Sequence, residues 1–132
     1  LMKLHRKNRV VLIKNTPSNI GMINKVKDYC TFGEVDTELV KELLEKRGRL
    51  PGNKLLTEAY LKKESKTDFN SLSKSLVEGK ASMKDIPGLK RFFKMHPPIG
   101  GFERGGIKHS YATGGALGYR GKEMSKLIQK MI

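Results

Sequence analysis

Residues 10–32 read VVLIKNTPSNIGMINKVKDYCTF, and this stretch decides the expected fold class. The short apolar run at 10–13 is rich in β-branched residues and predicts a strand covered on both faces. Thr16 is a good helix N-cap, and Pro17 suits the first helical turn because its missing N–H would have had no partner there. Apolar residues then recur three apart, which predicts a helix of about three turns. A second strand is expected at 29–32, so the stretch predicts strand, helix and strand in succession.

Further along the chain, apolar residues at helical spacing follow capping residues and end at glycines, which predicts more helices. These helices are expected at 36–48, 57–63 and 67–79, with an amphipathic C-terminal helix at 122–131.

Residues 89–95 predict a strand, although Phe92 shares a face with Lys90 and Lys94. That face is either half buried with its lysines reaching outward or itself a binding surface. The mixture of strands and helices predicts an α+β fold.

The longest stretch without a helical or strand period is residues 96–121, HPPIGGFERGGIKHSYATGGALGYRG. Irregular stretches of this length in a compact domain are usually functional or disordered. Basic residues, aromatic residues and paired glycines are interleaved here with little repetition, unlike in a low-complexity linker. We therefore interpret residues 96–121, called the glycine-rich arm below, as an ordered extension that binds a partner.

The charge of the chain points to the kind of partner. The 132 residues carry a net charge of +14, which favours a polyanion. Basic residues outnumber acidic ones in segments 1–27 and 69–132, whereas segment 28–68 is balanced. If the fold brings the two basic ends together, a positively charged face results. Nucleic acid is the expected partner class, and the alternative is a generally basic surface with no specific partner.

The composition of the arm suits RNA. Glycines let backbone amides approach phosphates, and basic side chains neutralise them. The basic candidates are Arg104, Lys108, Arg120 and Lys122. The aromatic candidates for stacking on an unpaired base are Phe102, Tyr111 and Tyr119. An equally weighted alternative for Tyr119 is that it pins the arm to its own core.

Other kinds of site find little support in the sequence. The arm has Ala116 and Glu123 where a phosphate-binding Walker loop needs glycine and serine or threonine, and G-x-G-x-x-G is absent from 114–121. The three histidines are far apart and have no cysteine or paired carboxylates at ligand spacing, so we expect no metal site and no cofactor. No G-x-S-x-G motif is present, and nothing in the sequence demands an enzyme.

The single cysteine, Cys30, excludes an intramolecular disulfide and is expected to be a small buried core residue in a reducing compartment. No apolar run approaches the roughly 20 residues of a membrane span. We expect a cytoplasmic protein with no membrane partner.

Two motifs carry a resemblance to a known family. The run at 16–26, TPSNIGMINKV, is similar to the signature helix of the large-subunit ribosomal protein L-thirty family, whose eukaryotic counterpart is ribosomal protein L-seven. The segments HPPIGG, GIKH and GGALG of the arm resemble the extension of its archaeal and eukaryotic members. The intact H-P-P-x-G-G favours the archaeal type.

The resemblance implies one domain spanning 1–132 with a ferredoxin-like split β-α-β core. Its parts would be a core remnant at 1–35, a helical insertion at 36–88, and a strand, the arm and the C-terminal helix at 89–132. Family members begin with a strand and a full helix that this chain lacks. We expect either that its beginning has been lost or that the sheet is one strand short, with an exposed edge that must be covered.

The resemblance also implies a structural constituent of the large ribosomal subunit that binds and stabilises folded rRNA of the 23S type, without catalysis or a small-molecule substrate. Neighbouring large-subunit proteins are further expected partners, and contact with 5S rRNA is left open. The expected RNA-facing residues of the N-terminal part are His5, Arg6, Lys7, Arg9, Gly21, Met22, Asn24 and Lys25. Those of the C-terminal part are Arg91, Lys94, His96, Pro97, Pro98, Gly100, Gly101, Phe102, Arg104, Lys108, His109, Gly114, Gly115, Tyr119, Arg120 and Lys122.

Two alternatives remain open. The chain would also suit a free-standing nucleic-acid-binding regulator or DNA-architectural protein. A small enzyme that uses the arm on a phosphorylated ligand is a third possibility, which the missing motif residues disfavour.

Overall fold

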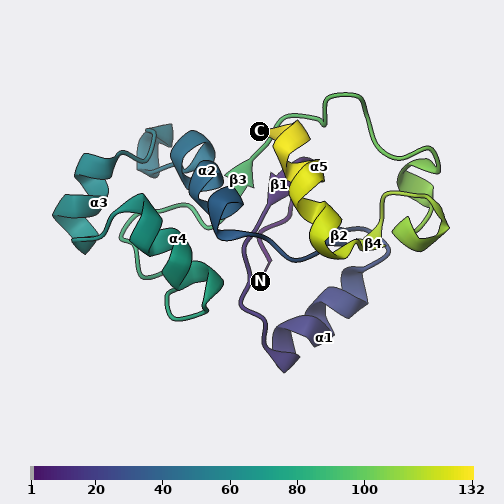
Figure 1. Ribbon diagram of the computed structural model, residues 1–132, viewed down its shortest axis with the longest axis horizontal. Helices are drawn as coiled ribbons and strands as arrows, with labels where there is room; N and C mark the ends of the chain where they lie inside the picture. Colours follow the sequence, from purple (N-terminus) through teal and green to yellow (C-terminus); the bar gives the residue numbers. More distant parts are fainter. Residues whose placement is uncertain (1) are drawn as a thin grey trace. The chain divides into compact units, whose positions relative to one another are not determined.

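A computed structural model describes residues 2–132, and these form two compact units (Figure 1). The first unit consists of residues 2–14, 36–96 and 132, and the second of residues 15–35 and 97–131. Each unit therefore joins a segment from the basic N-terminal part to a segment from the basic C-terminal part. The predicted division at residues 35 and 88 stays a prediction, and the expectation about a preceding strand and helix lies outside the described residues.

The predicted α+β class is confirmed, since small two-stranded sheets occur together with the helices α1 to α5 in the described part of the chain. This mixture is consistent with a ferredoxin-like α+β fold.

A short antiparallel pair of strands begins the first unit. In it, β1 (Arg9–Val10) pairs with β3 (Phe93–Lys94), so that Arg9 lies opposite Lys94 and Val10 opposite Phe93. The N–H of Met95 extends the pairing by donating to the carbonyl oxygen of Asn8 at 2.9 Å. Residues 8–10 and 93–95 thus lie side by side.

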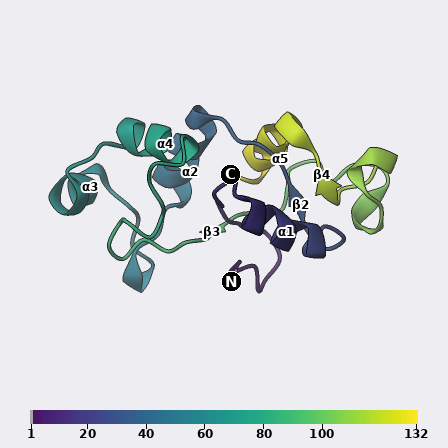
Figure 2. The same ribbon diagram turned by 90° about the horizontal axis from the view of Figure 1, so that it is seen from below.

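Three helices supply about half of the core of the first unit. They are α2 (Thr37–Arg47), α3 (Glu58–Ser65) and α4 (Phe69–Val77), with a 3₁₀ turn, η1 (Pro51–Asn53), after α2. Helix α2 packs against α4 and contacts β3 (Figure 2). The fully buried apolar residues of this unit are Val40, Leu43, Leu44, Leu61 and Phe93. Periodicity predicted both ends of each of these three helices to within two residues.

The second unit is built around a parallel pair of strands. Here β2 (Thr31–Phe32) pairs with β4 (Gly118–Tyr119), and Phe32 lies opposite Tyr119. Helix α1 (Pro17–Val26) precedes β2, and the Thr16 side chain accepts a hydrogen bond from the N–H of Asn19 at 3.3 Å, as its N-cap position predicts. The arm contains two 3₁₀ turns, η2 (Gly106–Lys108) and η3 (Tyr111–Thr113).

The C-terminal helix ends the second unit and holds the start of the arm. A 3₁₀ turn, η4 (Gly121–Glu123), leads into α5 (Met124–Met131), which buries Leu127, Ile128 and Met131. The N–H of Ile99 donates to the carbonyl oxygen of Lys130 at 3.0 Å. The predicted amphipathic helix is confirmed.

The strands are shorter than the sequence predicts. Only Val10 of the apolar run 10–13 is both paired and buried, whereas Val11 and Leu12 are half-buried and Ile13 is 36% exposed. The expectation of a strand covered on both faces is therefore wrong beyond Val10, because the partner strand β3 spans only two residues. Cys30 is half-buried instead of fully buried, and this burial raises the pKa of its thiol.

Candidate nucleic-acid interface

The glycine-rich arm folds back on itself through backbone hydrogen bonds. The N–H of Gly105 donates to the carbonyl oxygen of Gly114 at 2.9 Å. The N–H of Ala116 donates to the carbonyl oxygen of Gly106 at 3.0 Å. Gly115 is buried, and a Cβ atom there would collide with the backbone carbonyl of His109. Glycine is thus required at this position by close backbone approach, and the arm has an ordered path.

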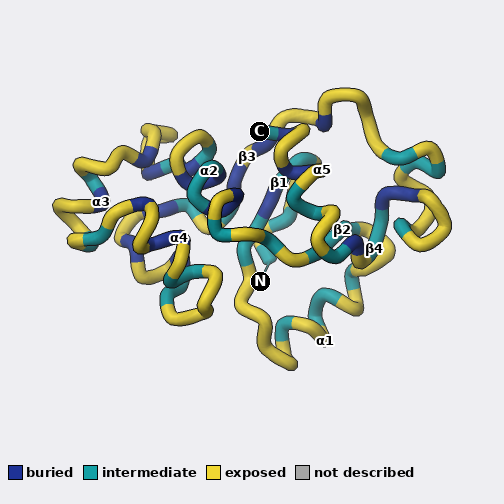
Figure 3. The backbone as a smooth tube through the Cα atoms, viewed as in Figure 1, coloured by how far each residue is buried: buried dark blue, intermediate teal, exposed yellow. Residues whose placement is uncertain are grey.

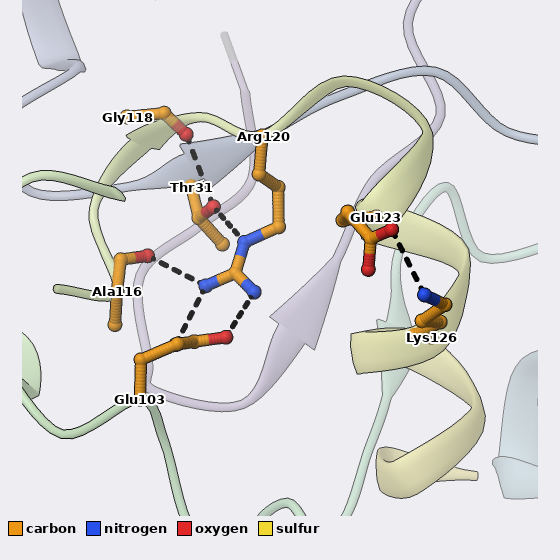
Figure 4. A network of polar contacts seen from close by, with 7 residues as sticks. All are labelled: Thr31, Glu103, Ala116, Gly118, Arg120, Glu123 and Lys126. Carbon is orange, nitrogen blue, oxygen red and sulfur yellow. Dashed lines mark hydrogen bonds and ion pairs between the residues drawn. The ribbon is translucent and has the colours of Figure 1, made fainter. Parts of the chain in front are cut away.

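Arg120 is the centre of a polar cluster that holds this path together (Figure 4). Its guanidinium donates to both carboxylate oxygens of Glu103, at 2.5 and 3.0 Å. It also donates to Thr31 Oγ1 at 2.9 Å and to the carbonyl oxygen of Ala116 at 3.0 Å. The guanidinium carbon lies 4.7 Å from the centroid of the Tyr111 ring. Four donated hydrogen bonds and a cation–π contact therefore engage this side chain within the protein.

The Arg120 cluster bears on the sequence-based prediction that Arg120 contacts RNA. Arg120 is only 5% exposed, so its charge is directed to Glu103 and not to a phosphate on the surface. The hydrogen bond from Arg120 holds the pKa of the Glu103 carboxyl below its ordinary value, which keeps the carboxylate charged. Arg120 ties the arm to β2, and its assignment to an RNA contact stays a prediction.

Two further predicted RNA-facing residues are buried. Pro98 and Gly115 have little exposed surface, because one lies at the anchored start of the arm and the other where two backbone segments meet. Little of their surface is therefore open to a partner, and the assignment of these two residues to an RNA contact stays a prediction.

Most of the other predicted residues of the arm lie on the surface. Phe102 and Tyr119 are 44% and 59% exposed. The remaining exposed members are His96, Pro97, Gly100, Gly101, Arg104, Lys108, His109, Gly114 and Lys122. The Tyr119 ring packs against Phe32 with centroids 5.7 Å apart, as expected if it pins the arm to the core, and its stacking on an RNA base stays a prediction.

Helix α1 presents its predicted residues to solvent. It has no buried residue along its length (Figure 3). Gly21, Asn24 and Lys25 are exposed, and Met22 is half-buried. A Cβ atom added at Gly21 would meet no atom within 4 Å, so packing within the chain does not require glycine there.

The predicted basic residues of the first unit lie on and beside the β1–β3 pair. His5, Arg6 and Lys7 are exposed ahead of β1, and Arg91 and Lys94 are exposed on the partner segment. Arg9 is half-buried because its guanidinium lies 4.3 Å from the centroid of the Phe92 ring. Pairing of β1 with β3 thus brings together basic residues that are far apart in sequence.

The second unit also contains a groove that the sequence did not predict. Its volume is about 680 Å³, and it is lined by the end of α1, by arm residues 108–112 and by the paired strands β2 and β4. Asn24, Lys27 and Asp28 contribute from α1 and the turn after it. The aromatic rings are those of Phe32, Tyr111 and Tyr119. Lys27 and Asp28 were missed because nothing in their local sequence differs from an ordinary solvated helix end.

No group of three or more histidine, cysteine or acidic residues able to hold a metal ion is found among residues 2–132. In the same residues, no helix is both long enough and apolar enough to span a membrane.

The sequence is similar to known proteins over its whole length. Residues 1–30 match the model of the family described as ribosomal protein L30p/L7e. Large ribosomal subunit protein uL30 of Methanopyrus kandleri is 47% identical over 133 residues, which cover 100% of this chain and 89% of that protein. The proteins of the same name from Nanoarchaeum equitans and Methanococcus maripaludis are 45% and 42% identical, covering 100% of this chain and 84% and 85% of theirs.

A small, basic α+β chain that is similar over its whole length to large ribosomal subunit proteins belongs to the class of ribosomal proteins. It belongs to the ribosomal protein L30p/L7e family, which includes the uL30 proteins. The resemblance drawn from residues 16–26 and from the arm is thereby confirmed, and so is the archaeal type, because these relatives are archaeal.

Proposed function

We propose that this protein is a structural constituent of the large ribosomal subunit in the cytoplasm, where it binds and stabilises folded 23S-type rRNA. Its relatives over the whole chain are named large ribosomal subunit proteins. The proposal includes contacts with neighbouring large-subunit proteins, and 5S rRNA is a further candidate contact. It assigns no catalytic step to the chain.

The observation that carries RNA binding is the distribution of ion pairs. None of the salt bridges among residues 2–132 involves Arg6, Lys7, Arg104, Lys108 or Lys122, and all five side chains are exposed. Cations of this kind lose no internal partner when they bind a phosphate, and each phosphate that they neutralise releases counterions. The lysines of α2, in contrast, pair with glutamates one turn away.

Helix α1 supports the same proposal through Gly21. Glycine inside a helix costs about 1 kcal/mol relative to alanine. Since no neighbouring atom needs the space above Gly21, we assign that space to an external backbone such as a sugar-phosphate chain. Asn24 and Lys25, exposed on the following turn, supply a hydrogen-bond donor and a charge.

The proposal predicts a steep dependence of RNA affinity on salt. A protein that contacts 6–10 phosphates loses about three to five decades of affinity between 50 and 200 mM salt. Filter binding of the protein to in vitro transcribed archaeal 23S-type rRNA measures this slope. As a matched control, Lys41→Gln and Lys46→Gln neutralise paired lysines of α2 and should leave the affinity within about twofold. A flat salt dependence would contradict the proposal.

Sedimentation of an archaeal cell lysate tests the assembly. Migration with large subunits through a moderate-salt wash is the expected result. Absence from the subunits, with RNA or DNA binding retained, would favour a free-standing regulator instead.

A further inference from the structure

The groove of the second unit is large enough to hold one nucleotide. Its volume of about 680 Å³ lies within the roughly 300–1,000 Å³ that is usual for small-ligand sites. An RNA duplex cannot enter such a groove, whereas an unstacked base can be extruded into it. The groove lies within one unit and joins α1 to the arm, the two parts to which the proposed function assigns RNA contact.

The aromatic residues of the groove form a stacking platform. Phe32 and Tyr119 lie opposite each other on β2 and β4, with centroids 5.7 Å apart and ring planes inclined by 44°. Phe32 is half-buried and supports the Tyr119 ring from one side. The Tyr119 hydroxyl lies 3.4 Å from Glu34 Oε1, which further limits the movement of the ring. Exposed rings held in this way stack readily on unpaired bases.

The polar residues of the groove match a nucleotide better than an apolar peptide. Lys27 and Lys108 are exposed lining residues, one at the end of α1 and the other in η2 of the arm, and neither takes part in a salt bridge among the described residues. They can neutralise the phosphates on either side of an extruded base. The groove contains no fully buried apolar residue to receive a hydrophobic anchor.

The chemistry of Asp28 favours some bases over others. It is an exposed lining residue and the only acidic one. A carboxylate accepts hydrogen bonds but donates none, so it pairs with base edges that carry N–H donors. Guanine presents two adjacent donors on its Watson–Crick edge, cytosine presents one amino group, and uracil presents an N–H between two acceptors that a carboxylate repels.

We propose that this groove binds a single unpaired nucleotide of the rRNA, stacked on Tyr119, with guanine as the preferred base. This inference rests on the proposed function, because it names the RNA feature that the α1 and arm surface receives. Lys27 and Lys108 hold the flanking phosphates, and Asp28 reads the base edge.

Short single-stranded RNAs test the groove directly. The heptamers UUUGUUU, UUUCUUU and UUUUUUU, titrated against the full chain with Tyr fluorescence as the readout, should bind most tightly with guanine at the centre, by about fivefold or more over uracil. Tyr119→Leu should weaken binding of UUUGUUU by roughly 5- to 150-fold, the loss expected for one base stack. Asp28→Asn, at an exposed position, should fold normally and abolish the preference for guanine.

Two matched controls separate stacking from other effects. Tyr119→Phe keeps the ring and removes only the hydroxyl, so it should recover most of the binding that Tyr119→Leu loses. Tyr29→Leu removes a tyrosine of the same unit that is 85% exposed but does not line the groove, and it should leave binding unchanged. Circular dichroism confirms the fold of each variant.

The full rRNA provides the decisive readout. Kethoxal modifies the Watson–Crick edge of unpaired guanines, so one guanine should be protected by the wild-type protein and exposed again with Asp28→Asn. Equal binding of all three heptamers, or no guanine whose protection depends on Asp28, would overturn the groove assignment even if salt-dependent rRNA binding persists. If the variants still bind RNA normally but no longer associate with other ribosomal proteins, the groove assignment would also be overturned, and the groove would instead bind a protein partner. Failure of the wild-type protein to bind rRNA at all would instead defeat the proposed function.

Discussion

Replacing Arg120 by methionine should destabilise the protein without acting on an RNA contact. The substitution keeps much of the apolar stem of the side chain and removes its guanidinium. It deletes the paired hydrogen bonds to Glu103 and the bonds to Thr31 and Ala116. The chain would lose the cluster that ties the arm to β2.

The magnitude follows from the burial of the pair. Removing one partner of a buried ion pair costs about 3–5 kcal/mol, because the other charge is left without compensation. The Glu103 side chain is 32% exposed, so water can hydrate part of the remaining carboxylate and the cost falls at the lower end. We expect a loss of about 3 kcal/mol, which lowers the Tm of a chain of this length by roughly 10 °C.

The assay pairs thermal unfolding with rRNA binding, and Lys122→Met is the matched control. Lys122 lies two residues away, is exposed and forms no salt bridge in the described part of the chain. Its replacement should change stability by no more than about 0.5 kcal/mol and lower the salt slope of rRNA binding by about 0.9. Arg120→Met should show the opposite result, a lower Tm with an unchanged slope at a temperature where it is folded.

The reasoning fails if Arg120→Met and Lys122→Met change the Tm and the salt slope in the same way, or if each shows the result expected of the other. A normal Tm for Arg120→Met, together with a salt slope reduced by about one, would mean that Arg120 binds a phosphate, as its sequence context suggests. Arg120→Lys sharpens the test, since it keeps the charge but cannot form the paired bonds to Glu103, and it should lose most of the same stability.

Further predictions concern pH, the glycines and the arm cations. Arg120 holds the pKa of the Glu103 carboxyl below its ordinary value of 4.5. The stability that the Glu103 carboxylate contributes should therefore be fully present above about pH 5 and be lost as the pH falls through the lowered pKa. The stability of Glu103→Gln should lack this pH-dependent loss in acid unfolding. Gly115→Ala should cost about 1–3 kcal/mol by chemical denaturation, because its Cβ would meet the His109 carbonyl. Gly21→Ala should stabilise α1 by about 0.5–1 kcal/mol yet weaken rRNA binding, and unchanged binding would remove Gly21 from the interface. Replacing Arg104 and Lys108 together by glutamine should reduce the salt slope by about 1.8 and shift the Tm by less than about 2 °C.

The helices and the class of fold were predictable because they depend on local spacing. Apolar residues three and four apart, with Thr16 before α1 and Gly48 after α2, mark the ends of helices from sequence alone. The strands were less predictable, since the length of a strand depends on how much of a partner backbone lies beside it. Val11 and Leu12 have the composition of a strand but no paired partner.

The sequence predicted the basic composition of the candidate interface, but only some of the residues that lie on its surface. Exposed Arg104, Lys108 and Lys122 agree in their placement with the expectation from charge. Arg120 has the same local context, and only the approach of Glu103, seventeen residues earlier, directs it inward. Lys27 and Asp28 become candidate RNA contacts only because they line the same groove as residues of the arm.

The sequence by itself determined the net charge, the helices and the membership of the L30p/L7e family, since these depend on composition, local period and motif order. Tertiary structure alone decided which basic side chains are buried and which are exposed. It also decided which aromatic rings line the groove. These properties depend on contacts between residues far apart in the chain, such as Arg120 with Thr31 and Phe32 with Tyr119, and no local pattern records such contacts.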